Sequence, residues 1–296
     1  MNLRPEWPTL GLFFVTYALW VAATLWLSDA SLPLAIAATG VLIALHASLQ
    51  HEATHGHPFS GRRWNTAVAF LPLTLVVPYF RFRDTHLDHH RNSHLTDPYD
   101  DPESNFLDPE RWARLPRAAR GFLAINNTLA GRILVGPLIG TTMFLVSEIR
   151  NLRRDPRVVR GWLWHFPMLV PVLAWVIWTP MPLWAYCVSA YVGLSLLRIR
   201  TFLEHRAHAQ SRARSVIIED RGPLALLFLN NNLHVVHHMH PQVPWYRLPG
   251  LYRRDAARFS RLNDGYVYRS YGEVFRRYLF RRKDPVPHPL WRGRAG

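Results

Sequence analysis

The stretch ASLPLAIAATGVLIALHASLQ, residues 30–50, contains no Asp, Glu, Lys or Arg and runs directly into the histidine-rich sequence HEATHGH of residues 51–57. At about 1.5 Å per residue, a helix of this length spans roughly 30 Å, the thickness of the hydrocarbon core of a bilayer. Another uncharged run, residues 7–28, precedes it, and only a tight turn fits between the two. The sequence therefore predicts a transmembrane helical hairpin near the start of the chain.

A second hairpin is predicted further along. Apolar residues 161–178 and 183–197 are separated by the sequence TPMP, which suits a turn. Two other apolar stretches, residues 64–80 and 121–149, are interrupted by Pro, Asn or Arg, and we interpret them as interfacial or re-entrant segments. The predicted fold is an all-α integral membrane protein with four transmembrane helices in two hairpins, interfacial helices and a cytoplasmic helical cap that holds the histidines, in one domain over residues 1–296.

The charge distribution predicts an orientation. The formal net charge is +15, but the two hairpin turns, residues 29–31 and 179–182, carry no Lys or Arg. Basic residues gather instead in residues 81–120, 150–160 and after 198, so positive-inside counting places these segments and both termini in the cytoplasm. We expect a bacterial inner-membrane protein whose basic face meets anionic lipid, and no nucleic-acid partner, since no recognised binding motif accompanies the charge. The single cysteine, Cys187, excludes a disulfide scaffold and a cysteine-held metal cluster.

Histidines are the most unusual feature of the composition, with 16 in 296 residues. Most fall into four clusters, which are His51, His55 and His57; His86, His89, His90 and His94; His205 and His208; and His234, His237, His238 and His240. Positions i, i+3 and i+4 of a helix share one face, so HxxxH and HxxHH patterns direct several imidazoles toward one point. One HxxHH pattern is expected by chance in about one of twenty such chains, whereas this chain has two. A shared metal site is the physical explanation.

The number of candidate ligands favours two metal ions. Structural zinc takes four protein ligands and catalytic zinc three, whereas eight or more imidazoles suffice for two ions. Imidazole suits iron, copper and zinc, and iron can also activate dioxygen. A competing interpretation is that His51, Glu52 and His55 form the HExxH motif of an intramembrane zinc protease. That enzyme would need only one further ligand, so the other histidine clusters would have no explanation.

As a set, HEATHGH, HLDHH and HVVHH resemble the three histidine boxes of the membrane-bound fatty acid desaturase superfamily, di-iron enzymes that include hydroxylases and carotenoid ketolases. The resemblance covers about residues 10–248. It implies that the metal ligands and catalytic residues are His51, His55, His86, His89, His90, His234, His237 and His238. It adds one ligand after the second hairpin, for which His205 is the best match and His208 the rival. His57, His94 and His240 are expected to hydrogen-bond around the metals instead of binding them.

The resemblance also implies a function. Two irons and dioxygen would remove hydrogen from an unactivated C–H bond, and loss of a second hydrogen would give a desaturase of a fatty acyl chain or lipid. Hydroxylation, ketolation or desaturation of a carotenoid or a modified amino acid is the alternative. An external electron donor, such as a ferredoxin with its reductase, is expected to meet the arginine-rich face. Carboxylates near the boxes could orient the imidazoles; the candidates are Glu52, Asp88, Asp97, Asp100, Asp101 and Glu103.

Overall fold

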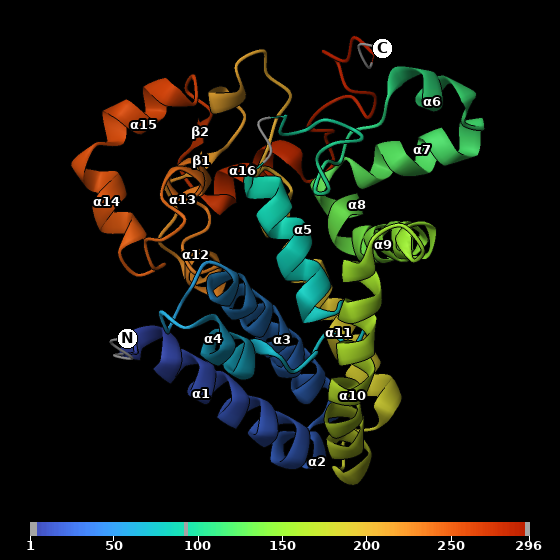
Figure 1. Cartoon of the computed structure of the whole chain (residues 1–296), viewed down its shortest axis with the longest axis vertical. Coiled ribbons are helices and arrows are strands. Elements are labelled where there is room, and N and C mark those ends of the chain that lie inside the picture. Colours follow the sequence, from blue (N-terminus) through green and yellow to red (C-terminus); the bar gives the residue numbers. More distant parts are fainter. Residues whose placement is uncertain (1–4, 92–93, 294–296) are drawn as a thin grey trace. The chain divides into compact units, whose positions relative to one another are not determined.

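The computed structural model describes residues 5–91 and 94–293 and is mostly helical (Figure 1). The chain forms two compact units. The first unit comprises the chain up to Asp84, Pro137–Leu197 and Leu227–Leu229, and the second comprises Thr85–Gly136, Arg198–Leu226 and the chain from Asn230 onward. Each unit is therefore built from segments that are distant in sequence.

The first unit contains the longest helices. They are α1 (Trp7–Ala22), which continues through a π-helical turn (Ala23–Leu27) into α2 (Ser28–Ala30), α3 (Leu32–Thr54), α4 (Arg62–Ala69), the start of α5 (Tyr79–Arg91), most of α9 (Gly136–Asn151), α10 (Pro156–Trp178) and most of α11 (Leu183–Thr201). Ser31 adopts an extended conformation between α2 and α3, and Pro33 in the first turn of α3 fits a helix start. The predicted first hairpin is thus present, with its turn at Ser31.

Three helical stretches of the described residues are long and apolar enough to cross a membrane, namely Trp7–Ala30, Leu32–Thr54 and Pro156–Trp178. Helix α11 occupies the predicted fourth span but is not among them, because Trp, Tyr, Ser and Gly residues and the terminal Arg198 and Arg200 make it less apolar. The four-span count is therefore not confirmed. The two interrupted stretches contain short helices, as α4 ends at Ala69 and residues 121–149 are divided among α7 (Arg117–Asn126), α8 (Leu129–Leu134) and α9.

The core of the first unit joins α1, α3, α10 and α11. Tyr186 of α11 is fully buried, where its hydroxyl accepts a hydrogen bond from Trp20 Nε1 (3.2 Å) and donates one to the carbonyl oxygen of Leu73 (3.0 Å). Helices α3 and α11 meet at two glycines, since a Cβ on Gly40 would lie 2.6 Å from Val192 Cγ1 and one on Gly193 would lie 2.7 Å from Ile43 Cγ2. Small residues permit this close approach of two membrane helices.

The second unit is made of short elements. They are the end of α5, α6 (Pro109–Arg114), α7, α8, the 3₁₀ turn Ser211–Ala213, most of α12 (Pro223–Leu227), α13 (His234–Met239), α14 (Leu248–Arg254), α15 (Ala256–Leu262), α16 (Tyr271–Tyr278) and a two-stranded parallel sheet of β1 (Ile217–Ile218) and β2 (Val267–Tyr268). Ile217, Val236, Leu248 and Phe259 form its apolar core. This core packs against α13 and so positions the third histidine box.

Candidate metal centre

Two short helical segments carry the HxxHH patterns of the second unit. In α5, His86 and His90 are one turn apart and their ring centroids lie 4.6 Å from each other. In α13, the rings of His234 and His238 lie 4.5 Å apart in the same relationship. The helical spacing therefore orients these imidazoles as the sequence predicts.

Within the second unit, the first histidine group comprises His86, His90 and His237. One nitrogen from each ring lies within 4.8 Å of the others, and His90 Nε2 is 3.1 Å from His237 Nε2. This group draws on both HxxHH segments, with two ligands from α5 and one from α13.

The second histidine group consists of His89, His205, His234 and His238, all in the second unit and all with one nitrogen within 4.8 Å of the others. His205 Nε2 lies 3.0 Å from His89 Nε2 and 3.1 Å from His234 Nε2. His238 Nε2 lies 3.1 Å from His234 Nε2. Helices α5 and α13 each contribute to both groups, because His89 faces differently from His86 and His90, and His237 differently from His234 and His238.

In three of these histidines the other ring nitrogen, Nδ1, contacts a hydrogen-bond acceptor. Asp101 Oδ1 is 2.7 Å from His89 Nδ1, and Glu103 Oε1 is 2.7 Å from His86 Nδ1. Asn231 Oδ1 is 3.1 Å from His234 Nδ1. Since these oxygens only accept hydrogen bonds, we assign the ring proton to Nδ1 in all three histidines. When these rings are neutral, each Nε2 presents a lone pair, which is the state that a metal ligand requires.

In the second group, Nε2 atoms face one another, and neutral rings have too few protons on these atoms for a hydrogen bond in every pair. If Nε2 of His89 and Nε2 of His234 both lack a proton, His205 Nε2 can donate to only one of them. A cation at the point where these nitrogens converge would satisfy all of them. The donor set is made entirely of imidazoles, which suits iron, copper or zinc and does not suit magnesium or calcium. The residues present therefore fit a transition-metal ion.

Electrostatics in the second group favour neutral rings with one exception. Burial and the neighbouring histidines hold the pKa of His205, His234 and His238 well below the usual value. Burial also acts against the charged form of His89, but the carboxylates of Glu103 and Asp101 outweigh it and raise its pKa to about 9. The surroundings of His89 therefore attract positive charge, which a bound metal cation would supply in place of the proton.

Two residues of the centre were not singled out by the sequence analysis. Glu204 accepts from Asn231 Nδ2 at 3.0 Å, and Arg200 Nε lies 3.0 Å from the same carboxylate oxygen. Asn231 is thereby fixed with its oxygen toward His234. Glu204 and Asn231 are 6% and 3% exposed. Their positions beside His205 and three residues before His234 are the only signals that the sequence offers.

The other histidines of the sequence clusters come from segments other than α5 and α13. His51 and His55 occupy the end of α3 in the first unit, with ring centroids 4.9 Å apart. His57 Nδ1 lies 2.9 Å from Glu6 Oε2, and His208 Nε2 lies 3.3 Å from Asp264 Oδ2. Neither His57 nor His208 belongs to a histidine group, and the same holds for His94 and His240.

In the described part of the chain, only some of the carboxylates that the sequence suggests as imidazole partners contact an imidazole. Asp101 and Glu103 contact imidazoles of the second histidine box, His89 and His86, as expected for carboxylates that orient them. Asp97 instead accepts from the backbone N–H groups of Tyr99 (2.8 Å) and Asp100 (3.0 Å), which makes it a turn residue. Asp100 is exposed.

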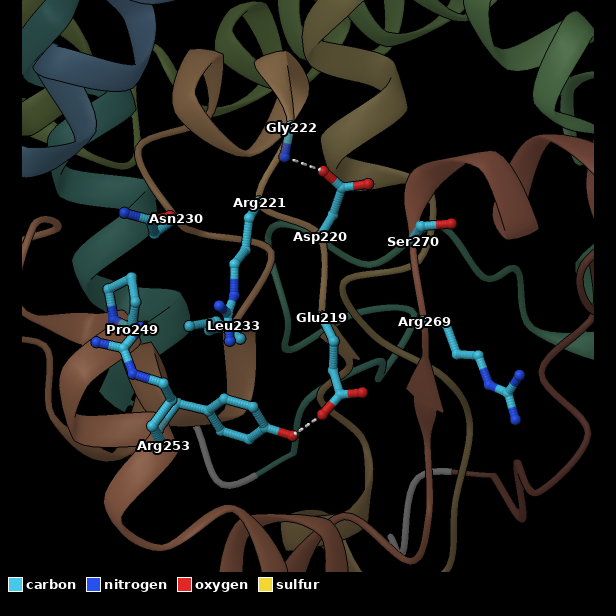
Figure 2. A pocket seen from close by; sticks show the side chains of 11 residues that line it. Glu219, Asp220, Arg221, Gly222, Asn230, Leu233, Pro249, Arg253, Arg269 and Ser270 are labelled. Carbon is cyan, nitrogen blue, oxygen red and sulfur yellow. Dashed lines mark hydrogen bonds between the residues drawn. The ribbon is translucent and has the colours of Figure 1, made fainter.

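A pocket of about 530 Å³, lined by several charged side chains, lies in the second unit (Figure 2). Arg221, Arg253 and Arg269 come to it from three different segments, and Tyr252 donates a 2.6 Å hydrogen bond to Glu219 at its wall. No member of either histidine group lines it. This pocket therefore has no part in holding the metal.

Comparison with known proteins confirms the resemblance. The sequence profile of the family described as Fatty acid desaturase matches residues 24–270. The chain is 30% identical over 258 residues to a β-carotene ketolase of Paracoccus sp. (strain PC1), covering 81% of this chain and 90% of that protein. It is 31% identical over 210 residues to a β-carotene ketolase of Paracoccus sp. (strain N81106 / MBIC 01143), covering 68% and 71%.

A plant protein is also similar. The probable fatty acid desaturase DES1 of Sorghum bicolor is 26% identical over 270 residues, covering 83% of this chain and 68% of that protein. The profile match spans both HxxHH segments and the end of α3, where the three boxes lie. The apolar helices, the two histidine groups and the profile match agree, and the chain belongs to the fatty acid desaturase family.

Proposed function

We propose that this chain is a membrane di-iron oxidoreductase that uses dioxygen to desaturate a long apolar substrate, a fatty acyl chain or lipid. The observation that carries the proposal is the pair of histidine groups, because α5 and α13 each contribute histidines to both of them. One group alone would serve any mononuclear site. Two groups that share both helices are typical of a centre for two ions.

The proposed ligands follow the boxes. His86, His90 and His237 hold one iron, and His89, His205, His234 and His238 hold the other. His51 and His55 are proposed as further ligands because they match the first box at helical HxxxH spacing. Two irons bound to these residues would supply the dioxygen chemistry that oxidises an unactivated C–H bond.

The protein residues around the irons have three tasks. Asp101, Glu103 and Asn231 fix the ring planes and retain a proton at Nδ1 of their histidines, which makes each Nε2 a better ligand. Burial of His86, His89, His234 and His237, of which His89 and His237 are 0% and 1% exposed, limits the access of water to the groups. The apolar helices of the first unit are suited to contact a hydrocarbon substrate.

A second candidate is oxygen insertion into a carotenoid-like substrate, as in a ketolase. It is favoured by one observation: the two relatives named β-carotene ketolase align over 90% and 71% of their lengths, against 68% for the relative named as a desaturase. Both reactions begin with the loss of hydrogen from a C–H bond. They differ in whether a neighbouring hydrogen leaves or oxygen is added.

The proposal includes an external electron donor and an orientation. Dioxygen chemistry of this kind consumes two electrons, and a ferredoxin with its reductase is the proposed source. The excess of 35 basic over 20 acidic residues would attract an acidic donor. We place the histidine groups on the cytoplasmic side of a bacterial inner membrane, because the basic segments surround them.

Metal analysis of the full chain, purified in detergent, tests the centre. His205→Ala and His208→Ala are a matched pair, since both histidines follow α11 but only His205 belongs to a group. About two irons per chain are expected in the parent and in His208→Ala, with a marked loss in His205→Ala. One zinc per chain, indifferent to His205→Ala, would refute the di-iron centre and support a zinc protease built on His51, Glu52 and His55.

Mass spectrometry of the product separates the two reactions. The iron-loaded chain, a ferredoxin, its reductase and a reductant are incubated with a fatty acyl lipid or with a carotenoid. Loss of two hydrogens from the acyl lipid supports desaturation. Gain of oxygen on the carotenoid, with the acyl lipid unchanged, would replace that proposal by the second candidate.

A further inference from the structure

Two arginine side chains of the second unit lie over the same glycine. A Cβ placed on Gly136, the first residue of α9, would lie 3.1 Å from Arg132 Cδ and 3.5 Å from Arg198 Cγ. Arg132 comes from α8 and Arg198 from the end of α11. The absence of a side chain at Gly136 therefore gives both arginine side chains room beside α9, where the charge of Arg198 acts on Arg132.

Neither guanidinium forms an ion pair with a carboxylate in the described part of the chain, although the charge of Glu204 acts on Arg198 from a greater distance. Arg132 is 5% exposed and donates only to neutral oxygens, those of the Asn126 backbone (3.0 Å) and the Asn105 side chain. Its guanidinium also lies 6.0 Å from the centroid of the Phe202 ring. Arg198 is half-buried and forms no ion pair with a described residue.

The nearby carboxylates already serve other cations. Asp284 lies 3.5 Å from Lys283 Nζ, and Glu204 is held by Arg200 and Asn231. Because an arginine side chain stays protonated, burying two of them together is costly unless an anion is shared between them. Burial and the charge of Arg198 both lower the pKa of Arg132, which reflects the same lack of negative charge.

A third polar group faces the same space. The side-chain oxygen of Asn126 lies 3.2 Å from the Gly136 Cβ position and is buried without a hydrogen-bond partner among the described residues. The oxygen and nitrogen of an amide are assigned from their surroundings. Turning this amide over would direct its NH₂ group at an anion bound by the two arginines.

The surroundings indicate what kind of molecule carries the anion. Phe122 and Ile125 of α7 and Leu134 of α8 are 44%, 57% and 68% exposed. Helix α7 also carries Arg117 and Arg120, so basic residues in its first half precede the exposed apolar residues of its second half. Exposed apolar side chains on a basic helix are typical of a segment that lies at the surface of a bilayer. This is the segment that the sequence predicts to be interfacial or re-entrant.

We propose that Arg132 and Arg198 bind the phosphate of an anionic phospholipid, whose acyl chains lie along Phe122, Ile125 and Leu134. Guanidinium groups bind phosphate oxygens in a bidentate manner. Phosphatidylglycerol suits the site better than phosphatidylcholine, because its headgroup brings no cation next to the two arginines. The site goes beyond the proposed oxidation and does not depend on it.

Thermal unfolding of the iron-loaded, delipidated full chain in detergent tests the proposal. A ligand that binds the folded state raises the unfolding midpoint. Phosphatidylglycerol should raise it more than phosphatidylcholine does. Arg198→Gln should need at least about ten times more phosphatidylglycerol for half of the effect. Arg117→Gln, which removes an exposed charge of α7, should respond like the parent.

A cooperative unfolding transition of Arg198→Gln without lipid, at a midpoint close to that of the parent, serves as its fold control. Arg198→Lys, which retains one charge, should respond between the parent and the Gln variant. Equal responses of the parent and Arg198→Gln would refute the site, as would the absence of any preference for phosphatidylglycerol. Inorganic phosphate is added in the last experiment, in place of the lipid and together with it. If it reproduces the shift and blocks that of phosphatidylglycerol, the site binds free phosphate and the lipid proposal is wrong.

Discussion

Asp101 Oδ1 lies 2.7 Å from His89 Nδ1, and both side chains are almost completely shielded from solvent, at 1% and 0% exposed. The same carboxylate accepts the backbone N–H groups of Thr96 (2.7 Å) and Glu103 (2.9 Å). Asp101 therefore ties the loop after α5 to the one histidine of α5 that belongs to the second group. Its position is fixed by backbone groups as well as by the imidazole.

Asp101→Asn is expected to weaken iron binding by about 10- to 100-fold, because the amide is a poorer acceptor for the Nδ1 proton of His89. Iron retention against a chelator measures the effect. Asp100→Asn is the control, since Asp100 is exposed and adjacent in sequence. Equal retention in both variants would show that the Asp101–His89 contact does not tune the metal.

Asn231→Leu is expected to lower stability by about 1–3 kcal/mol, because it leaves buried Glu204 without one of its donors and the Nδ1 proton of His234 without its acceptor. Iron content should fall as well. Asn151→Leu, which loses a 3.3 Å hydrogen bond to Ser147, should change little. Thermal unfolding and metal analysis of the two variants provide the comparison, and an unchanged Asn231→Leu would contradict a positioning role.

Gly193→Val is expected to destabilise the first unit by at least about 1–3 kcal/mol, because even its Cβ would lie 2.7 Å from Ile43 Cγ2 and 3.0 Å from the Gly40 carbonyl oxygen. Gly11→Val, where a Cβ meets nothing within 4 Å, should be tolerated. The unfolding midpoint of each variant in detergent measures the difference. If Gly193→Val unfolds like the parent, α3 and α11 are not in close contact.

Removal of the metal is expected to lower the unfolding midpoint, since a metal that binds only the folded chain stabilises it. Adding Fe²⁺ back to the chelated chain should restore the midpoint. His205→Ala should show a smaller restoration than His208→Ala, because only His205 belongs to the second group. An identical response of the two variants would argue against His205 as a ligand.

The helical spacing of the histidines is the strongest sequence signal, and it predicts that the rings four residues apart in α5 and in α13 lie close together. It does not predict that His89 and His237 join the other group, because that depends on how α5 and α13 face each other. His205 and His208 could not be separated in this way, because they follow the end of α11 where no helical periodicity applies. The structure pairs His208 with Asp264, which is distant in sequence. Asn231 was missed for a similar reason, since its partner Glu204 lies 27 residues away in an irregular segment.

Hydropathy was a good guide to three of the four predicted spans. Helices α1, α3 and α10 each belong to a stretch with a long apolar run, which identifies the stretch as a candidate span. Helix α11 is different, as Tyr186 is stabilised by Trp20 and Leu73 and Gly193 packs on α3. These residues are explained by tertiary contacts in the first unit, which hydropathy does not register.

Helices α5 and α13 each place neighbouring residues into different histidine groups, as His89 and His90 or His237 and His238 do. Adjacent helical residues are separated by a rotation of about 100° and a rise of about 1.5 Å. The offset between the two groups is thus dictated by helix geometry and not by loop conformation. A small rotation of α5 or α13 would therefore move members of both histidine groups at once, so the positions of the two groups are mechanically coupled.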